Sequence, residues 1–454
     1  MTLESINPVN GQVIKTYQSY SDETIEAMLV KGHDAFQRHR KTTYDERAQK
    51  MRSVASYLDE HKAEFASLAT MEMGKTYLSA LVEVEKCASL CRYYADHAEI
   101  FLADQVVETQ AARSFVRYLP IGIVLAVMPW NFPFWQVFRF AVPALMAGNV
   151  GLLKHASNVS GCALAIEEAF SLNGFGKGAF QTLLIGSDKV AQIIADDRIS
   201  AVTLTGSEKA GSAVAAQAGQ YLKKAVLELG GSDPFIVMPS ADIDHALDLA
   251  VKGRVQNNGQ TCIAAKRYII HSDIYDAFRA QLIERFESLV VGDPMDEKTD
   301  VGPLSSAQIR NELQEQVTET VRLGAVKLCG AEIMAGEGNF YRPGLLENIP
   351  PDSPAYKDEL FGPVGLLFKV ADMDQAIALA NDTRFGLGSV ICTQDEGDVA
   401  RAINEIDAGV TFVNDTVSSN PTLPFGGTKK SGFGRELSAE GIREFTNIKT
   451  VVAR

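Results

Sequence analysis

The sequence is poor in cysteine and histidine for a chain of its length. Its 454 residues include six cysteines and seven histidines, and no two cysteines form a Cys-x-x-Cys pair. Cys87 and Cys91 are one helical turn apart, but no histidine cluster accompanies them, as a metal site would require. These absences exclude a disulfide-stabilised scaffold and predict a reduced, cytoplasmic protein without a metal site.

Positive charge and long apolar segments are also scarce. Lys and Arg number 43 against 57 Asp and Glu, which gives a formal net charge of −14 at pH 7. A nucleic-acid partner is therefore not expected, because phosphate backbones are bound by clustered Lys and Arg. Apolar runs such as residues 121–128 fall far short of the roughly 20 residues that span a bilayer. The first residues lack the basic and apolar regions of a secretory signal, so no membrane association is expected.

What is present is the composition of a globular protein, with 46% hydrophobic and 22% charged residues. At ~150 residues per domain, the length predicts about three domains. Apolar positions spaced by three and four over residues 21–105 predict helices, which begin near Ser21 and Thr43. Strand-like runs then alternate with helical ones, at residues 122–128, 150–154, 181–185, 201–204, 234–238 and 267–270. The alternation predicts parallel βαβ units, in a doubly wound sheet followed by a second α/β layer.

One cysteine has neighbours that suit a reactive site. Cys262 follows the sequence Asn-Asn-Gly-Gln-Thr, in which glycine and small polar residues let the backbone approach a substrate closely. A free thiol is only a few per cent thiolate at neutral pH, so a nucleophile here needs local activation. The alternative is a buried structural cysteine, which is the usual fate of this residue type.

A glutamate lies at the end of a predicted strand. Glu228 is flanked by leucines and followed by Gly230 and Gly231, which allow a tight turn. Burial of a carboxylate raises its pKa, and a carboxylate poised near pH 7 can act as a general base. The alternative is an exposed glutamate on an edge strand.

Two further segments each follow a predicted strand. Asn131 lies between Pro129 and Pro133, which hold the loop rigid, and its amide could donate to a developing oxyanion. The alternative is a turn capped by the asparagine. Gly206 and Ser207 join a strand to a helix, an arrangement in which backbone N–H groups bind phosphate, although the spacing is not G-x-G-x-x-G.

These motifs, together with residues 359–363 and the glycine-rich loop 424–432, resemble the aldehyde dehydrogenase superfamily in order and spacing. The resemblance extends from residue 7 to the C-terminal strand. It implies a cofactor-binding domain (residues 1–106 and 119–230), a catalytic α/β domain (231–443) and oligomerisation strands (107–118 and 444–454). Such strands imply a homodimer or homotetramer. The apolar strand at residues 446–453 could also pair with another chain rather than with its own sheet.

The resemblance also implies catalytic roles. Cys262 matches the nucleophile that adds to an aldehyde and forms a thiohemiacetal, with Asn131 and the Cys262 N–H stabilising the oxyanion. Hydride transfer to a nicotinamide then leaves a thioester. Glu228 matches the general base that activates water for its hydrolysis.

Cofactor residues carry over in the same way. The positions that match the family's cofactor site are Trp130, Lys154, Gly206, Ser207, Glu359 and Phe361. Ser157 is an informative departure, because members that prefer NAD often carry a glutamate at this position, three residues after the lysine. Without that carboxylate nothing repels a 2′-phosphate. We therefore predict that NADP is preferred and that NAD remains possible.

The substrate is predicted from positions that match bacterial-type succinate-semialdehyde dehydrogenases. Arg139 matches an arginine that binds the distal carboxylate, and Ser419 matches a serine that assists it. The alternative for Arg139 is a surface salt bridge. The predicted apolar walls are Trp135, Phe138 and Phe425. A second arginine that such enzymes often carry is replaced here by Gln256, and Arg254 is expected to face differently.

The predicted reaction is the NADP-dependent oxidation of succinate semialdehyde to succinate. One alternative is the same chemistry on another small aldehyde, such as glutarate semialdehyde or an aromatic aldehyde. Another is transfer of the thioester to coenzyme A, which Glu228 disfavours because acylating relatives tend to lack this base. A third is a binding or structural protein that has lost catalysis, against which the presence of Cys262, Glu228 and Asn131 argues.

Overall fold

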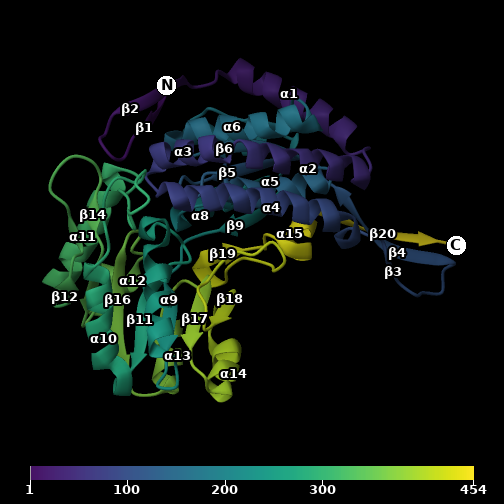
Figure 1. The fold of residues 1–454 in the computed structure, drawn as a ribbon. Helices are drawn as coiled ribbons and strands as arrows, with labels where there is room; N and C mark the ends of the chain where they lie inside the picture. Colours follow the sequence, from purple (N-terminus) through teal and green to yellow (C-terminus); the bar gives the residue numbers. More distant parts are fainter. Residues whose placement is uncertain (1) are drawn as a thin grey trace.

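The computed structural model describes residues 2–454 of the chain (Figure 1). It begins with a hairpin of β1 (Thr2–Ile6) and β2 (Val13–Gln18). Four helices follow, α1 (Asp22–His39), α2 (Tyr44–Glu60), α3 (Lys62–Met73) and α4 (Tyr77–Phe101). The Ser21 hydroxyl caps α1, and Thr43 forms a capping box with Glu46 at the start of α2. Both predicted helix starts are thus confirmed.

The first large sheet has six strands in the order β19-β9-β8-β5-β6-β7. Its members are β5 (Ile123–Met128), β6 (Val150–His155), β7 (Phe180–Thr182), β8 (Ile199–Thr205), β9 (Lys224–Glu228) and β19 (Gly432–Phe433). All pairs are parallel except that of β19 with β9. The chain runs outward from β5 through β6 to β7, then crosses to β8 and β9 on the other side. This doubly wound order places the carboxyl ends of the parallel strands along one edge.

Helices and short turns connect these strands. They are α5 (Trp135–Met146), η1 (Ser157–Val159), α6 (Ser160–Phe170), η2 (Ser171–Phe175), η3 (Ser187–Lys189), α7 (Val190–Ala195) and α8 (Glu208–Gln220). Five of the six residues of β5 are buried, as expected for a central parallel strand covered on both faces. Every residue of α5 is buried as well, because this helix lies between the sheet and α4.

The second large sheet has seven strands in the order β12-β15-β16-β11-β10-β17-β18. They are β10 (Asp233–Val237), β11 (Ala265–His271), β12 (Val326–Cys329), β15 (Gly344–Glu347), β16 (Val364–Val370), β17 (Gly388–Cys392) and β18 (Val410–Val413), and only β12 is antiparallel. Its helices are α9 (Ile243–Val255), η4 (Gln256–Gly259), α10 (Ser272–Glu287), α11 (Ala307–Arg322), α12 (Pro354–Lys357), α13 (Met373–Asn381) and α14 (Glu396–Glu405). A small hairpin of β13 (Glu332–Ile333) and β14 (Tyr341–Arg342) lies beside it. The second α/β layer is thus confirmed.

A third sheet projects from the body at the right of Figure 1. It contains β20 (Thr446–Ala453), β4 (Arg113–Pro120) and β3 (Gln105–Val106) in that order. β20 pairs with β4 of the same chain over eight residue pairs. β20 therefore belongs to a sheet of its own chain. The expectation that it could pair with another chain instead is wrong for the edge that meets β4. β20 is an edge strand of this sheet, so one of its two edges is not paired within residues 2–454.

The chain returns to the first sheet before its end. β19 pairs with β9, η5 (Lys429–Ser431) precedes β19, and α15 (Ser438–Glu444) packs against α4 and α5. The predicted boundary at residue 443 assigns this segment to the second domain, whereas β19 lies against the first sheet; the domain bounds themselves stay a prediction. The physical reason is that the glycine-rich loop crosses back so that β19 can cover the free edge of β9.

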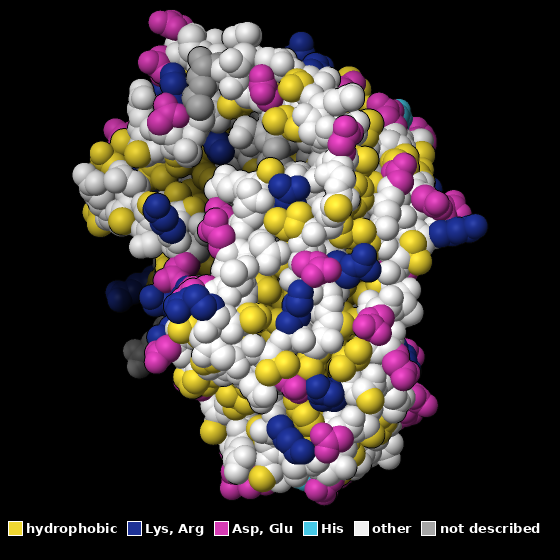
Figure 2. Space-filling view, turned by 90° about the vertical axis from the view of Figure 1, so that its left-hand side faces the viewer, with side chains coloured by type: hydrophobic (Ala, Val, Ile, Leu, Met, Phe, Trp, Pro, Cys, Tyr) yellow, Lys and Arg dark blue, Asp and Glu magenta, His cyan; other side chains and the backbone are white. Residues whose placement is uncertain are grey.

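Charges of both signs are interspersed on the face drawn in Figure 2, without a large patch of either sign. That face therefore offers no continuous positive track of the kind that binds a nucleic-acid backbone. Within residues 2–454, no helix combines the length and the apolar character needed to cross a membrane.

Candidate active site

The residues predicted from the motifs meet at the carboxyl edge of the first sheet. Asn131 follows β5, Ser157 follows β6, Gly206 follows β8, and Glu228 ends β9. Cys262, which precedes β11 of the second sheet, faces the same edge. A cavity of about 250 Å³ is lined by Pro129, Trp130, Asn131, Gln136, Thr205, Gly206, Ser207, Leu229, Gly230, Cys262, Ile309, Glu359 and Phe361. The fold therefore brings residues from both α/β units into one cleft.

The loop before Cys262 is held in an unusual backbone conformation. Asn257 and Asn258 have φ angles of 55° and 57°, and Gly259 has a φ of 74°. A Cβ at Gly259 would lie 2.5 Å from the backbone of Gly362, so only glycine fits there. The Asn257 side chain donates to the carbonyl of Asn131 at 2.8 Å. The nucleophile loop is thus fastened to the loop that follows β5.

The Cys262 side chain is half-buried beside a lysine. Burial raises its pKa to about 12, and the positive charges of Lys266 and Arg139 oppose that shift. The Lys266 ammonium donates to the carbonyl oxygens of Cys262 at 2.7 Å and Thr261 at 3.1 Å. It also pairs with Glu359 at 3.0 Å. Lys266 therefore opposes the rise in the thiol pKa without reversing it, so this lysine supplies only part of the activation that a thiol nucleophile needs.

The Asn131 amide is fixed close to the nucleophile loop. Its Nδ2 donates to the carbonyl of Gln260 at 2.9 Å, and its Oδ1 accepts from Gln136 Nε2 at 3.1 Å. These two bonds settle which end of the amide carries the hydrogens. Since an amide nitrogen has two donors, one remains for an oxygen that approaches from the cavity. This geometry suits the predicted oxyanion role.

Glu228 is buried at the end of β9 and faces the glycine-rich loop. Neither of its carboxylate oxygens has a hydrogen-bond partner among residues 2–454. Burial raises its pKa well above the ordinary range, the nearby Glu436 raises it further, and Arg139 and Arg435 oppose both effects. Glu228 is absent from the cavity lining at Cys262, so it must turn toward the cavity to act there.

Arg139 lies in a buried ion pair. Its Nε is 2.5 Å from a carboxylate oxygen of Glu436, and both side chains are 4% exposed. The guanidinium also lies 4.8 Å from the centre of the Phe425 ring. Phe425 and Glu436 face each other through two backbone hydrogen bonds of 2.8 Å, which fix the acid opposite the arginine. Arg139 therefore does form a salt bridge, as the alternative held, but the pair is buried and not on the surface.

Ser419 and Trp135 are in direct contact, as their predicted roles in one site require. The Trp135 indole donates to Ser419 Oγ at 2.8 Å. Lys86 of α4 donates to the same oxygen at 3.1 Å and lies 4.1 Å from the centre of the Trp135 ring. Phe138 differs, because its ring is fully buried and stacks on Phe170 at 5.1 Å. The packing corrects the prediction that Phe138 forms a wall of the substrate site.

On the cofactor side, two aromatic rings flank the cavity. Trp130 and Phe361 lie edge to face with centres 5.7 Å apart. Glu359 accepts from the backbone N–H of Gly231 at 3.2 Å. Ser207 caps α8 by accepting from the N–H of Ala210, so the start of this helix lines the cavity. Glycines, a helix start and aromatic faces fit a dinucleotide.

The predicted adenosine end lies after β6. Lys154 is half-buried, which lowers its pKa, while Asp188 raises it without forming an ion pair. Ser157 is exposed at the start of η1. A hydroxyl and a lysine, without an adjoining glutamate, fit a 2′-phosphate on the ribose.

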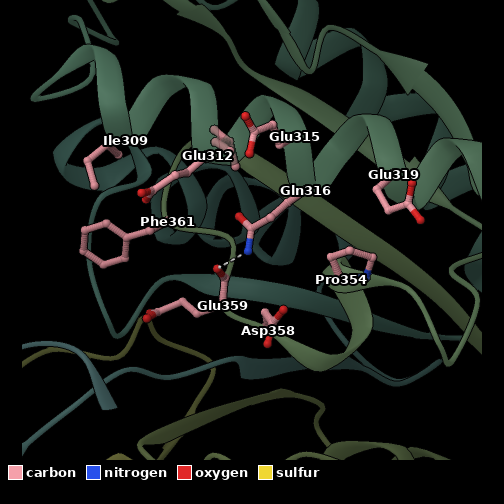
Figure 3. A pocket seen from close by; sticks show the side chains of 10 residues that line it. Ile309, Glu312, Glu315, Gln316, Glu319, Pro354, Asp358, Glu359 and Phe361 are labelled. Carbon is pink, nitrogen blue, oxygen red and sulfur yellow. Dashed lines mark hydrogen bonds between the residues drawn. The ribbon is translucent and has the colours of Figure 1, made fainter. Parts of the chain in front are cut away.

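An acidic groove adjoins the cleft on the side of α11 (Figure 3). Its lining includes the carboxylates of Glu312, Glu315, Glu319, Asp358 and Glu359. In Figure 3, Gln316 donates to the backbone of Glu359, a bond of 3.3 Å. Anionic phosphates would be repelled by this groove. Gly206 and Ser207, which line the neighbouring cavity and not this groove, would suit the phosphates of a dinucleotide better.

Several residues of the site were not identified in the sequence. Lys266 contacts the backbone of Cys262, Glu436 pairs with Arg139, and Lys86 donates to Ser419. Only Lys266 had a local signal, namely its position four residues after Cys262. Arg254 is fully buried, and its guanidinium donates to the carbonyls of Gly259, Leu360, Gly362 and Val364. It therefore ties the loop of Cys262 to the loop of Glu359, and the expectation that it faces differently from position 256 stays a prediction.

A sequence model of the aldehyde dehydrogenase family matches residues 1–451. The chain belongs to the aldehyde dehydrogenase family. It is 51% identical over 451 residues to the "Probable succinate-semialdehyde dehydrogenase [NADP(+)]" of Synechocystis sp., covering 99% of each chain. It is also 51% identical over 454 residues to "Succinate-semialdehyde dehydrogenase [NADP(+)] 1" of Mycobacterium tuberculosis, again covering 99% of each.

A solved structure of this aldehyde dehydrogenase fold is similar over the whole chain. The crystal structure of succinic semialdehyde dehydrogenase from Streptococcus pyogenes in complex with NADP+ superposes with a TM-score of 0.97. The two chains are 37% identical, and the match covers 99% of each. The predicted fold, a doubly wound cofactor-binding unit with an α/β catalytic unit and a small β element, is confirmed.

Proposed function

We propose that this aldehyde dehydrogenase oxidises succinate semialdehyde to succinate and prefers NADP. The observation that carries the substrate is the buried guanidinium of Arg139, which lies on the helix that follows Asn131 and faces Phe425 and Glu436. An aldehyde at Cys262 with a short chain can therefore place a terminal carboxylate near a buried guanidinium. The names of the two relatives at 51% identity support the same substrate and cofactor.

The proposed chemistry assigns each step to a residue of the cleft. The Cys262 thiol first loses its proton to water. The thiolate then adds to the aldehyde carbon, and the Asn131 amide donates to the oxyanion that forms. Trp130, Glu359 and Phe361 line the same cavity and would hold a nicotinamide cofactor, which would supply the hydride acceptor. Glu228, once turned toward the cavity and deprotonated, takes a proton from the water that hydrolyses the thioester.

The proposed NADP preference is supported by the charges after β6. Ser157 is exposed and offers a hydroxyl where a glutamate would repel a 2′-phosphate. Lys154 adds a positive charge at the end of the same strand. NAD remains a possible second cofactor, since a small residue at position 157 does not exclude it.

Initial-rate kinetics test this proposal. Succinate semialdehyde should be oxidised with a higher kcat/KM with NADP than with NAD. Arg139→Ala should raise KM for succinate semialdehyde by about tenfold or more. Weak activity with either cofactor, or a higher kcat/KM for glutarate semialdehyde or an aromatic aldehyde, would contradict the substrate and favour one of those alternatives.

We also propose that the projecting sheet joins two copies of the chain into a homodimer or homotetramer. Val106, Ile448 and Val452 of this sheet are 79%, 63% and 59% exposed, which is unusual for aliphatic side chains. An Ile448→Asp and Val452→Asp double variant should be smaller than wild type in analytical ultracentrifugation. Equal masses would contradict this proposal.

The protein is further proposed to work in the cytoplasm. All six cysteines carry free thiols, and five of them are buried, which suits a reducing compartment. Fractionation of cells that produce the protein with its own termini tests this location.

A further inference from the structure

Lys86 lies beside the predicted substrate residues. It is a half-buried residue of α4, and its ammonium donates to Ser419 Oγ at 3.1 Å. The same ammonium lies 4.1 Å from the centre of the Trp135 ring, one helical turn from Arg139 on α5. The Lys86 ammonium thus faces a serine and an indole. Lysines are seldom buried in this way for a structural purpose alone.

Ser419 accepts two hydrogen bonds from the protein and can still donate one. Its oxygen accepts from Trp135 Nε1 and from Lys86 Nζ, which uses both of its lone pairs. Within residues 2–454 Ser419 donates no hydrogen bond. Its hydroxyl is therefore free to donate to a bound ligand. Lys86 also keeps donors in excess, since an ammonium has three and only one is bonded here.

The charges around Lys86 do not balance. Lys75 pairs with Glu83, and Arg139 pairs with Glu436. In the part of the chain that the structure describes, Lys86 forms no ion pair with a carboxylate. Lys86 thus has no carboxylate of its own, and an unpaired charge in a half-buried position is costly. A bound anion would remove that cost.

We propose that Lys86, together with Ser419, binds the carboxylate of the aldehyde substrate and determines specificity for ω-carboxy aldehydes, which carry a terminal carboxylate. This inference rests on the proposed function and adds a residue that the sequence motifs do not indicate. Arg139 already forms an ion pair with Glu436, so a substrate carboxylate near Arg139 would have to share the guanidinium with that acid. Lys86 supplies a cation without a competing acid, and it compensates for the arginine that Gln256 replaces.

The charge on Lys86 is sensitive to pH. Burial lowers its pKa to about 8, and the positive charges of Arg139 and Lys75 act in the same direction. Cys87 and Glu83 oppose this shift. Lys86 is therefore charged below about pH 8 and loses its charge as the pH rises through that value. Carboxylate recognition should weaken over the same range.

The test compares succinate semialdehyde with butanal, which has the same number of carbons and no carboxylate. The ratio of the two kcat/KM values cancels effects that are common to both aldehydes. Lys86→Met should lower this ratio by about tenfold or more, and Lys86→Arg, which keeps the charge, should retain most of it. Lys252→Met, at an exposed lysine of α9, is the matched control and should leave the ratio unchanged. Thermal unfolding and NADP binding verify that each variant folds.

The pH dependence gives a second readout. In wild type the ratio should fall as the pH rises through about 8, because kcat/KM reports groups of the free enzyme. In Lys86→Arg the ratio should stay constant over the same range, since arginine keeps its charge. A ratio that Lys86→Met leaves unchanged, or a fall with pH that Lys86→Arg retains, would overturn the assignment.

The outcomes separate this inference from the proposed function. If wild type prefers succinate semialdehyde to butanal but Lys86→Met changes nothing, the inference fails and the function stands. If wild type prefers a longer ω-carboxy aldehyde to its uncharged counterpart and Lys86→Met abolishes that preference, the substrate proposal fails and the inference stands. If no carboxylated aldehyde is preferred to its uncharged counterpart, both are overturned.

Discussion

The cofactor side and the substrate side of Cys262 differ in how far their charged groups are exposed to water. On the cofactor side, Ser157 is exposed and Lys154 half-buried, so water screens them. On the substrate side, Arg139 and Glu436 are almost entirely removed from water. A charge in water tolerates the loss of a neighbour, whereas a buried one does not. Changes on the cofactor side should therefore alter selectivity alone, and changes on the substrate side should alter selectivity and stability together.

Cys262 joins the two sides, and its replacement should have the largest effect. Cys262→Ala should lower kcat by about 10⁴-fold or more, because the covalent path is lost. NADP binding should persist, since the other residues that line the cleft are unchanged. Stopped-flow measurements should show no burst of reduced cofactor. If a burst persisted, Cys262 would not be the nucleophile.

Glu228 should have the next largest effect, on the second half of the reaction. Glu228→Gln should lower the steady-state rate by about 10²–10³-fold while the burst persists, because only water activation needs the base. The carboxyl must be ionised to act, and its pKa is raised, so the steady-state rate of wild type should fall with falling pH through that raised value. Glu228→Gln should lack this dependence. A burst that disappeared along with turnover would place Glu228 in the first half instead.

The Glu228→Gln variant also tests how a buried charge near Arg139 affects the stability of the protein. The folded state holds Glu228 protonated over a pH range in which the unfolded chain ionises it, because its pKa is raised by burial. Stability from this group is therefore lost as the pH rises from its ordinary value of about 4 to the raised one. Glu228→Gln should raise the melting temperature at neutral pH, and this gain should vanish near pH 4. Calorimetry at the two pH values measures the difference.

The cofactor side could be predicted from the sequence more completely than the substrate side. Asn131, Gly206 and Cys262 lie in turns where proline, glycine and small polar residues give local signals. The carboxyl ends of parallel strands then bring such turns together without further information. Strand alternation likewise predicted both large sheets, because a parallel strand buried on both faces has a local pattern.

The substrate side lacked such signals for a physical reason. Every residue of α5 is buried, so no polar face distinguishes Trp135, which meets Ser419, from Phe138, which meets Phe170. Glu436 reaches Arg139 only because the chain returns beside Phe425. The pairing of β20 with β4 joins segments more than 300 residues apart. Contacts of this range leave no trace in local periodicity.

The ion pair of Arg139 and Glu436 tests the substrate side directly. Arg139→Met should destabilise the protein by about 3–5 kcal/mol, because it leaves a buried carboxylate without its partner. The double variant Arg139→Met and Glu436→Gln should recover much of this loss, since both charges are then removed. Chemical denaturation measures all four proteins of the cycle. Additive losses would mean that the two side chains are not coupled, and the contrast between the two sides would fail.

Ser157 provides the smallest effect and the opposite expectation. Ser157→Glu should shift the ratio of kcat/KM for NADP to that for NAD toward NAD by about tenfold or more, because a carboxylate repels a 2′-phosphate. Its effect on the free energy of unfolding should stay within about 0.5 kcal/mol, as for most exposed positions. Ser157→Ala is the matched control and should move the ratio less, since it removes a hydroxyl without adding a charge. A ratio that Ser157→Glu did not move would show that the 2′-phosphate is not recognised at this position. An exposed side chain has no buried partner, so little stability should be lost. A large loss of stability would instead show that the cofactor side is as tightly coupled as the substrate side.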